Sequence, residues 1–359
     1  MSTIEQDLVT TIDRIAADHC DRAAREQAEK GQWPAALWQA LADVGLTAAT
    51  VPEAHGGPGL EFDDAMAALR RSAYHALPVP LAETFAAARL LVAAGLIVPS
   101  GALTVAQGGE SEPLQLVERD GVLRLTGIAR RVPWGGQCAA TVVVARLDGR
   151  EMLAVVDGAA GFVASERNLA GEPRAMLEFD RAAVLAAAPL ERASARLAEE
   201  GALMRSVQMT GALSRSLEHA IQYANERIAF GRPIAKFQAV QQMLAVMAGH
   251  AAAASAAADF AVERSAEETN RLAVSVAKSR VGEAAGRGAE IAHQVHGAMG
   301  FTHEHNLHWS TRRLWAWRDE FGGDAFWQMQ LGRAAAVVGA DALWTFLATM
   351  SAPSLEVAA

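Results

Sequence analysis

The sequence predicts an α+β fold in three consecutive parts. These are an N-terminal helical domain over residues 1–100, a small antiparallel β-barrel or sandwich over 101–187, and a C-terminal four-helix bundle over 188–359. Apolar residues recur at helical spacing in the first and third parts, whereas the middle part has short alternating runs joined by turn dipeptides. A chain of 359 residues with 51% hydrophobic content is long enough to bury several such units.

The N-terminal part predicts four helices. Ile4, Leu8, Ile12 and Ile15 share one face of the first, and WPAALWQALADVGLT forms a second that ends at Gly45. The glycine-rich turn VPEAHGGPGL separates it from a third helix, EFDDAMAALRRSAYHAL, which begins with acidic residues as helix N-termini do. A proline-containing joint then leads into a fourth helix in LPVPLAETFAAARLLVAAGL.

The middle part predicts two β-hairpins followed by further short strands. LQLVERDGVLRLTG turns at Asp120-Gly121, and ATVVVARLDGREMLAVV turns at Asp148-Gly149. Asp-Gly between alternating runs is a strong hairpin signal. FVASERNL and RAMLEFDRAAV add strands, and this spacing favours a small antiparallel barrel or sandwich.

The C-terminal part predicts four long helices with short joints, which is the pattern of a bundle. The third runs from about Arg271 to His296 and the fourth from about Asp324 to Thr349. Apolar residues mark one face of each of the first two helices: Leu203, Val207, Thr210, Leu213, Leu217, Ile221, Ala224 and Ile228, and then Phe237, Val240, Leu244, Met247 and Ala251.

Composition excludes several functions. The net charge of −9 and a pI near 5.6 argue against nucleic-acid binding, which needs a basic face. The N-terminus lacks the pattern of a signal peptide, and the Ala-rich apolar stretches are interrupted, so no membrane span is expected. Cys20 and Cys138 lie far apart and predict neither a disulfide nor a metal cluster. The sequence therefore predicts a reduced, cytoplasmic protein.

The segment NERIAFGRPIAKFQAVQ, residues 225–241, breaks a helical pattern at Phe230-Gly231-Arg232-Pro233. Gly231 suits the left-handed geometry of a helix terminus, and Pro233 suits a first helical turn. Arg227 before the break is either a surface arginine on a helix hairpin or a guanidinium that grips a phosphate. About fifty residues later, in QVHGAMGFTHEHN, Gln294 precedes a turn that contains Gly297 and Gly300. This turn is either an ordinary helix C-terminus or a place where the backbone approaches a ligand closely.

Together these two motifs and VPEAHGGPGL resemble the acyl-CoA dehydrogenase family of flavoproteins, and the helix, sheet, helix order agrees over nearly the whole chain. The resemblance implies FAD bound between the sheet domain and the bundle, with a neighbouring subunit completing the site. Arg227 would hold the pyrophosphate of a flavin lying mostly on the adjacent subunit. Phe230 and Gln238 would lie near the adenosine half, and the other side would be lined by Gln294, Gly297 and Ala298, the last of which replaces a usual glycine.

The reaction implied by the resemblance is α,β-dehydrogenation of an acyl-CoA thioester, with electrons passed to an electron-transfer flavoprotein. It needs a carboxylate base for the α proton. Glu320, followed by Phe-Gly-Gly, stands one residue from the family position, with Asp319 as second choice; the alternative interpretation is a solvated charge cluster. Some members carry the base on the first bundle helix, where this chain has Met204.

The sheet domain departs further from the family. The flavin-stacking tryptophan-threonine pair is matched only loosely around Trp134 in RRVPWGGQCAA. Some family members place a buried arginine near the active site at the position of Arg205, which is equally a plain salt-bridge partner. The chain resembles the shortened subunits of bacterial mixed assemblies, often linked to CoA esters of steroids. We therefore expect a homo- or hetero-oligomer, a dimer or tetramer, and a non-catalytic subunit that completes a partner's FAD site is the alternative.

The histidines of HEHNLH, at 303, 305 and 308, invite comparison with a metal site. Their spacing fits neither a two-histidine helix motif nor a zinc knuckle, and no cysteine is near. A polar loop beside the glycine turn is the interpretation we adopt, and no metal is expected.

Overall fold

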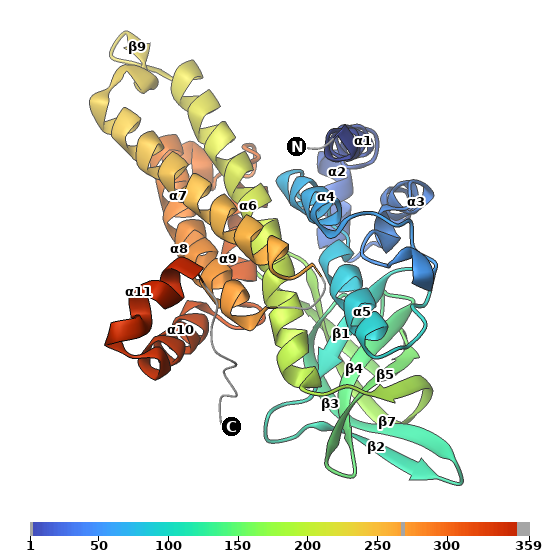
Figure 1. Ribbon diagram of the computed structural model, residues 1–359. Coiled ribbons are helices and arrows are strands. Elements are labelled where there is room, and N and C mark those ends of the chain that lie inside the picture. The colour runs from blue at the N-terminus through green and yellow to red at the C-terminus, as the bar shows by residue number, and fades with distance from the viewer. Residues whose placement is uncertain (1–2, 267–269, 350–359) are drawn as a thin grey trace.

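The computed structural model describes residues 3–266 and 270–349. The three parts follow the predicted order: N-terminal helices, a sheet domain, and a second set of long helices (Figure 1). The predicted bounds of the outer domains include residues 1–2, 267–269 and 350–359, which lie outside the described residues.

The described part of the N-terminal domain, from residue 3 on, contains five helices, because the first predicted helical region divides at Asp21. The Asp21 carboxylate accepts a hydrogen bond from the backbone N–H of Ala24 at 2.8 Å and so caps a new helix. The helices are α1 (Thr3–His19), α2 (Arg22–Glu29), α3 (Ala35–Asp43), α4 (Phe62–Tyr74) and α5 (Leu81–Ala93), with short 3₁₀ turns η1 (Leu46–Ala48) and η2 (Glu53–His55). The predicted glycine turn depends on Gly57, since a Cβ there would meet the carbonyl oxygen of Val51.

The sheet domain is a closed barrel. Its strands are β1 (Leu103–Gln107), β2 (Leu114–Arg119), β3 (Val122–Pro133), β4 (Ala140–Leu147), β5 (Arg150–Asp157), β6 (Phe162–Arg167) and β7 (Pro173–Pro189). The order β4-β2-β3-β7-β5 returns to β4, which closes the ring.

The prediction of a purely antiparallel sheet is wrong in one respect. β1 pairs with β4 in parallel, and so does β2 over a short stretch. Two parallel strands cannot be joined by a hairpin, so a turn motif in the sequence cannot predict their pairing. Both predicted hairpins are confirmed, with Asp120-Gly121 and Asp148-Gly149 in the left-handed conformation that two-residue hairpin turns need.

The C-terminal bundle contains α6 (Ala193–Glu226), α7 (Gln238–Glu263), α8 (Arg271–His296), α9 (Leu307–Asp319), α10 (Asp324–Val338) and α11 (Ala340–Thr349), with η3 (Ile234–Lys236) and η4 (Gly297–Phe301). The third predicted helix is confirmed at both ends. The fourth is two helices, because Gly339 adopts a left-handed φ of 78° and turns the chain. The tryptophan-rich segment before Glu320 adds α9 as a further bundle helix.

Helix α7 is long and apolar enough to cross a membrane by length and composition, the one such helix in the described part of the chain. It packs instead along α6 and α8 through buried Met247 and the buried alanines Ala251, Ala254 and Ala258. This packing is that of a bundle helix.

Candidate functional site

The break in the 225–241 motif is a projecting hairpin. Helix α6 ends at Glu226, and strands β8 (Ile228–Ala229) and β9 (Arg232–Pro233) form a two-residue hairpin at the far end of the bundle (Figure 1). Phe230 and Gly231 both have positive φ, of 52° and 78°. Gly231 is therefore left-handed as predicted, but in a hairpin turn rather than a helix terminus.

Pro233 ends β9 and is the N-cap residue of η3, so it stands directly before a 3₁₀ turn and not within the first turn of α7. The backbone N–H of Ile234 donates to the carbonyl of Arg227 at 2.8 Å and closes the base of the hairpin.

The two family-like motifs meet in space. Helix α8 ends at His296, and Gly297 caps it with φ 58° and ψ −138°, a conformation that suits glycine. The His296 ring stacks on Tyr223 of α6 at a centroid distance of 4.6 Å. Because Tyr223 lies two residues before the first motif and His296 lies within the second, this stack fixes the hairpin-bearing end of α6 against the glycine corner of α8.

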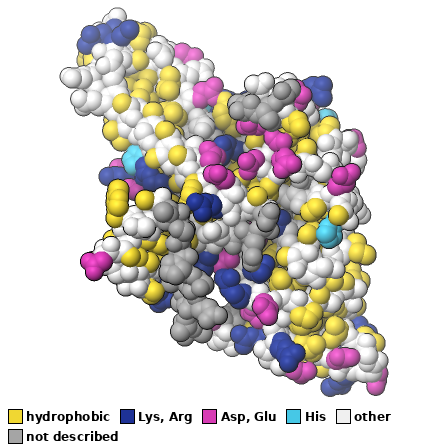
Figure 2. All heavy atoms as spheres, in the orientation of Figure 1, with side chains coloured by type: hydrophobic (Ala, Val, Ile, Leu, Met, Phe, Trp, Pro, Cys, Tyr) yellow, Lys and Arg dark blue, Asp and Glu magenta, His cyan; other side chains and the backbone are white. Residues whose placement is uncertain are grey.

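The residues predicted to hold a dinucleotide are exposed at this end of the bundle. Phe230 is 96% exposed, and the side chains of Arg227, Gln238 and Gln294 also face solvent. Gly297 and Ala298 are exposed on the glycine corner. Lys and Arg side chains gather at the end of the projection (Figure 2), where the sequence has Arg227, Arg232 and Lys236.

A second group of functional candidates lies where the three parts of the chain meet. We call it the charge cluster, and it contains Glu83, Asn168, Glu172, Arg174, Arg205, Arg313 and Glu320. Its three arginines and three glutamates are buried or nearly so and balance in charge. Buried charges need partners of this kind.

Glu320 lies at the centre of the charge cluster, and its side chain is 10% exposed. Its Oε1 accepts from Arg174 Nε at 2.9 Å and from Asn168 Nδ2 at 3.1 Å, and its Oε2 accepts from Arg205 Nε at 2.8 Å. Burial alone would raise the pKa of Glu320, but Arg174 and Arg205 lower it to about 2. A carboxylate with this pKa is a weak proton acceptor.

A buried lysine holds the backbone on both sides of Glu320. Lys278 of α8 donates through Nζ to the carbonyls of Arg318 at 2.6 Å and Gly322 at 2.8 Å. Burial lowers the pKa of Lys278 to about 8. The Trp327 indole N–H donates to the carbonyl of Phe321 at 3.1 Å. The orientation of Glu320 is thus set by both its side-chain and its backbone contacts.

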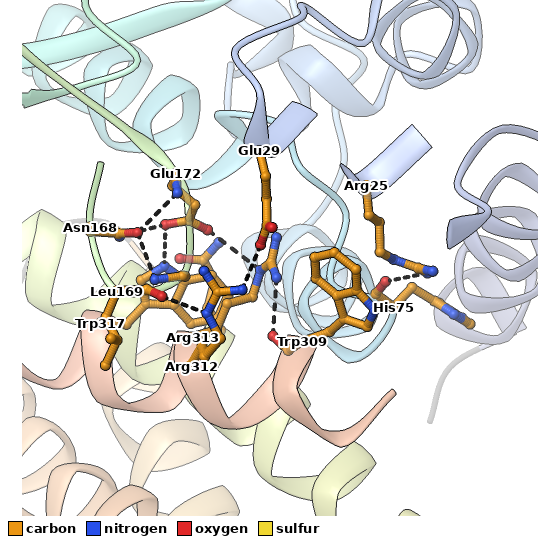
Figure 3. Close-up of polar contacts among 12 residues, drawn as sticks. Arg25, Glu29, His75, Asn168, Leu169, Glu172, Trp309, Arg312, Arg313 and Trp317 are labelled. Atoms are coloured by element: carbon orange, nitrogen blue, oxygen red, sulfur yellow. Dashed lines mark hydrogen bonds and ion pairs between the residues drawn. The ribbon is translucent and has the colours of Figure 1, made fainter. Parts of the chain in front are cut away.

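Glu172 joins the sheet domain to α9 in the same cluster (Figure 3). It accepts a 3.0 Å hydrogen bond from the Trp317 indole and lies 3.5 Å from the Arg313 guanidinium. Beside it, Arg312 donates to the carbonyl of Leu169 at 2.7 Å. Helix α9 is therefore fastened to the β6–β7 connection along its length.

Arg205 is a buried ion-pair partner, and its proximity to an active site stays a prediction. It is 2% exposed and pairs with Glu83 of α5 as well as Glu320. Met204 beside it is buried and apolar. Asp319 is exposed, and its side chain forms no hydrogen bond or ion pair with the residues that the structure describes.

A cavity of about 420 Å³ opens next to Glu320, between the barrel and the bundle. We call it the junction cavity. Its polar lining residues are Gln107, Arg130, Arg131, Arg174, Asp319 and Glu320. The volume lies within the range of small-molecule sites, roughly 300–1,000 Å³.

Trp134 does not line the junction cavity. Its side chain is 3% exposed and packs in the core with its ring 6.2 Å, centroid to centroid, from that of Trp33. In this structure the cavity therefore presents no exposed indole face of Trp134. The flavin-stacking role of Trp134 stays a prediction.

Sequence reasoning missed Asn168, Glu172 and Arg174. Their partners, Trp317 of α9 and Glu320 just after it, lie 145–152 residues away in the sequence. A spacing pattern in the sequence therefore could not predict these contacts. The signal that existed was compositional: the charged residues Glu172 and Arg174 flank Pro173 at the start of the strand that contains RAMLEF.

The histidine-rich segment forms an aromatic cluster. His305 contacts the rings of His219 and His296, at centroid distances of 5.5 and 4.5 Å, and His303 contacts His308 at 5.3 Å. Within residues 3–266 and 270–349, no group of His, Cys, Asp or Glu has metal-binding geometry.

Comparison with known proteins agrees with this architecture. The family model described as "Acyl-CoA dehydrogenase, C-terminal domain" matches residues 190–335, and "Acyl-CoA dehydrogenase, N-terminal domain" matches residues 2–101. Acyl-CoA dehydrogenase FadE27 of Mycobacterium tuberculosis is 28% identical over 332 residues, covering 84% of this chain and 89% of that protein.

Two solved structures are also similar over most of their length. A chain of the ChsE4-ChsE5 complex from Mycobacterium tuberculosis is 26% identical with a TM-score of 0.86, covering 95% of this chain and 99% of that one. A chain of the Tcur3481-Tcur3483 steroid ACAD G363A variant is 25% identical with a TM-score of 0.81, covering 92% and 96%. The chain described here therefore belongs to the acyl-CoA dehydrogenase family, whose members are FAD-dependent flavoproteins.

Proposed function

We propose that this chain works in the FAD-dependent α,β-dehydrogenation of an acyl-CoA thioester, as one subunit of an oligomer that passes electrons to an electron-transfer flavoprotein. The observation that carries the proposal is the contact between the two motifs. The Tyr223–His296 stack holds the exposed hairpin and the glycine corner at one end of the bundle. Within residues 3–266 and 270–349, Phe230 is 96% exposed and the Arg227 side chain has no hydrogen-bond or ion-pair partner.

The residues at this end fit part of an FAD molecule. Arg227 supplies a fixed cation for a pyrophosphate, and the backbone at Gly297 and Ala298 is open to close approach. Phe230 and Gln238 supply an aromatic face and a polar side chain for the adenosine half. When bound, FAD supplies the acceptor for the β hydrogen, and the protein supplies position and a base.

This chain offers groups for the pyrophosphate and adenosine of FAD, but fewer for the flavin ring. The junction cavity, where this chain would cover a flavin ring of its own, presents arginines and no exposed tryptophan. This favours a flavin held mainly by a neighbouring subunit, toward which this chain extends its hairpin. Arg227, Phe230 and Gln294 would then orient the cofactor, without removing a proton themselves.

A second candidate function is favoured by the contacts of Glu320. Ion pairs to Arg174 and Arg205 lower its pKa to about 2, which suits a structural anchor better than a general base. In this alternative the chain is a non-catalytic subunit, and the base that removes the α proton comes from its partner. Asp319, exposed on the wall of the junction cavity, is the remaining carboxylate in reach of a ligand there.

The relatives suggest the assembly and the substrate. One similar structure is described as a complex of two differently named proteins and another as a steroid ACAD. We extend both to this chain as proposals: a heteromeric assembly in the cytoplasm, acting on a CoA ester with a bulky ring system.

The experiment is to purify the chain alone, and again with any co-expressed neighbouring family subunit, and to record flavin spectra. If the chain is yellow and its flavin bleaches with an acyl-CoA, the catalytic candidate is supported. A colourless chain that gives a yellow, active complex only with its neighbour supports the non-catalytic candidate. Absence of flavin from every assembly supplied with FAD would refute both.

A matched pair of variants sharpens the test. Arg227→Ala should lower flavin retention, whereas Arg150→Ala, which removes an exposed arginine from the β4–β5 hairpin, should leave it unchanged. Equal retention in the two variants would exclude a role of Arg227 in holding the pyrophosphate.

A further inference from the structure

Arg130 and Arg131 are adjacent in β3, yet both line the junction cavity. In a regular strand, neighbouring side chains point to opposite faces of the sheet. Here the register between β3 and β7 slips: Ala129 pairs with Leu177 and Val132 with Ala175, so β3 holds one extra residue. This β-bulge is what brings two consecutive arginines to one wall.

The bulge carries a backbone cost. Arg131 has a φ of 56°, in the left-handed region that residues with a Cβ rarely occupy. Such a conformation costs about 1–3 kcal/mol and persists only where the surrounding structure imposes it. Bulges of this kind re-aim side chains beside functional sites.

The two arginines have no carboxylate partner within the described residues. The contact recorded for Arg130 is a 3.5 Å approach of Nη1 to the Met176 sulfur. Arg174, the third arginine of the cavity, is saturated by Glu172 and Glu320. Arg130 and Arg131 thus line the cavity as exposed arginines without an ion pair among the described residues, and each guanidinium group carries five N–H donors.

The charge balance of the wall favours a monoanion. Glu320 is neutralised by its ion pairs, which leaves Arg130 and Arg131 against Asp319, an excess of one positive charge. The remaining side chains of the cavity are mostly apolar, and they include Val105, Ala106, Val132, Leu197 and Phe321. A ligand that combines an apolar chain with a single negative charge matches both kinds of wall.

We propose that the junction cavity binds an acyl group that ends in a carboxylate, and that Arg130 and Arg131 select for that carboxylate. This inference rests on the proposed function, because it takes the acyl group of a CoA thioester as the ligand. A phosphate of coenzyme A offers similar oxyanion chemistry, and the test separates the two sources.

The experiment measures binding by calorimetry to the FAD-loaded assembly, using glutaryl-CoA, pentanoyl-CoA and free CoA. The two thioesters have acyl chains of equal length and differ in the terminal carboxylate. We expect glutaryl-CoA to bind at least about tenfold more tightly, as charge-assisted hydrogen bonds to arginine allow. In the double variant R130Q/R131Q this preference should disappear, while the affinity for pentanoyl-CoA stays the same.

The matched control is R146Q/R150Q, which removes two exposed arginines from the β4–β5 hairpin of the same domain and should retain the preference. Denaturation midpoints of both double variants verify folding. Equal binding of the two thioesters to the unaltered protein would overturn the inference. So would an equal loss of affinity for free CoA and glutaryl-CoA in R130Q/R131Q, because the arginines would then contact coenzyme phosphates.

Failure of this inference is distinct from failure of the proposed function. If pentanoyl-CoA is dehydrogenated without any preference for glutaryl-CoA in binding, the cavity inference fails and the function stands. If the carboxylate preference is present but no acyl-CoA on a broad panel is dehydrogenated, the arginine site stands and the proposed function fails.

Discussion

Replacing Glu320 by Gln separates an anchoring role from a catalytic one. Gln keeps the size of the side chain and one acceptor oxygen but cannot carry the charge that faces Arg174 and Arg205. It therefore resembles a permanently protonated glutamate. If Glu320 is an anchor, the substitution acts on stability; if it is a base, it acts on turnover.

The expected loss of stability follows from the pKa of Glu320. In the folded chain this pKa falls from an ordinary value of 4.5 to about 2. Because a tenfold change in proton affinity corresponds to about 1.4 kcal/mol, the charged carboxylate contributes roughly 3 kcal/mol at neutral pH. Breaking a buried ion pair by removing one partner costs about 3–5 kcal/mol, a similar magnitude.

The assay is urea denaturation at pH 7, followed by tryptophan fluorescence, for the unaltered chain and Glu320→Gln. A carboxylate with a lowered pKa stabilises fully above about pH 4.5, and this contribution is lost as the pH falls through about 2. The difference between the two proteins should therefore shrink in the same series as the pH approaches 2.

Asp319→Asn is the matched control, since it neutralises the exposed neighbouring acid and should change stability by less than about 0.5 kcal/mol. A loss below about 1 kcal/mol in Glu320→Gln, combined with a turnover reduced more than about a thousandfold, would refute the anchoring role and restore Glu320 as the base.

Three further predictions concern other parts of the molecule. Phe230→Ala should leave the stability of the separate chain unchanged, because the side chain is 96% exposed. It should weaken subunit association, measured by sedimentation, or flavin retention, measured by absorbance, about tenfold. Burial lowers the pKa values of His219 and His296 to about 4, so between pH 6.5 and 4 the unfolded chain binds more protons than the folded chain. The urea denaturation midpoint should therefore decrease as the pH is lowered from 6.5 to 4, and a midpoint that does not change with pH would contradict this. Gly211→Ala should destabilise the chain by about 1–3 kcal/mol in urea, since its Cβ would lie 2.1 Å from the carbonyl oxygen of Arg70, and an unchanged midpoint would show that α4 shifts freely.

Features set by local chemistry could be predicted from the sequence. The Asp120-Gly121 and Asp148-Gly149 turns specify their own hairpins, and helix α8 is recognisable from its apolar spacing and its terminal Gly297. The division at Gly339 was missed because the apolar pattern continues across it, and one glycine within a helical pattern is commonly tolerated.

Features set by long-range contacts could not be predicted. The parallel pairing of β1 with β4 depends on barrel closure and not on any turn. The environment of Glu320 depends on Arg174, 146 residues away, and on Arg205, 115 residues away. Trp134 was placed near the cofactor by its neighbours in sequence, but the competing contact with Trp33 is visible only in three dimensions.

The charge cluster also limits how the protein can be dissected. Arg205 and Arg313 belong to the bundle, whereas their carboxylate partners Glu83 and Glu172 belong to the helical domain and the barrel. A fragment comprising the bundle alone would leave Arg313 without Glu172 and Arg205 without Glu83, and Glu320 would be the one carboxylate of the cluster left beside Arg205. Domain-by-domain expression should therefore yield aggregates, and an intact monomer should unfold in one transition rather than three.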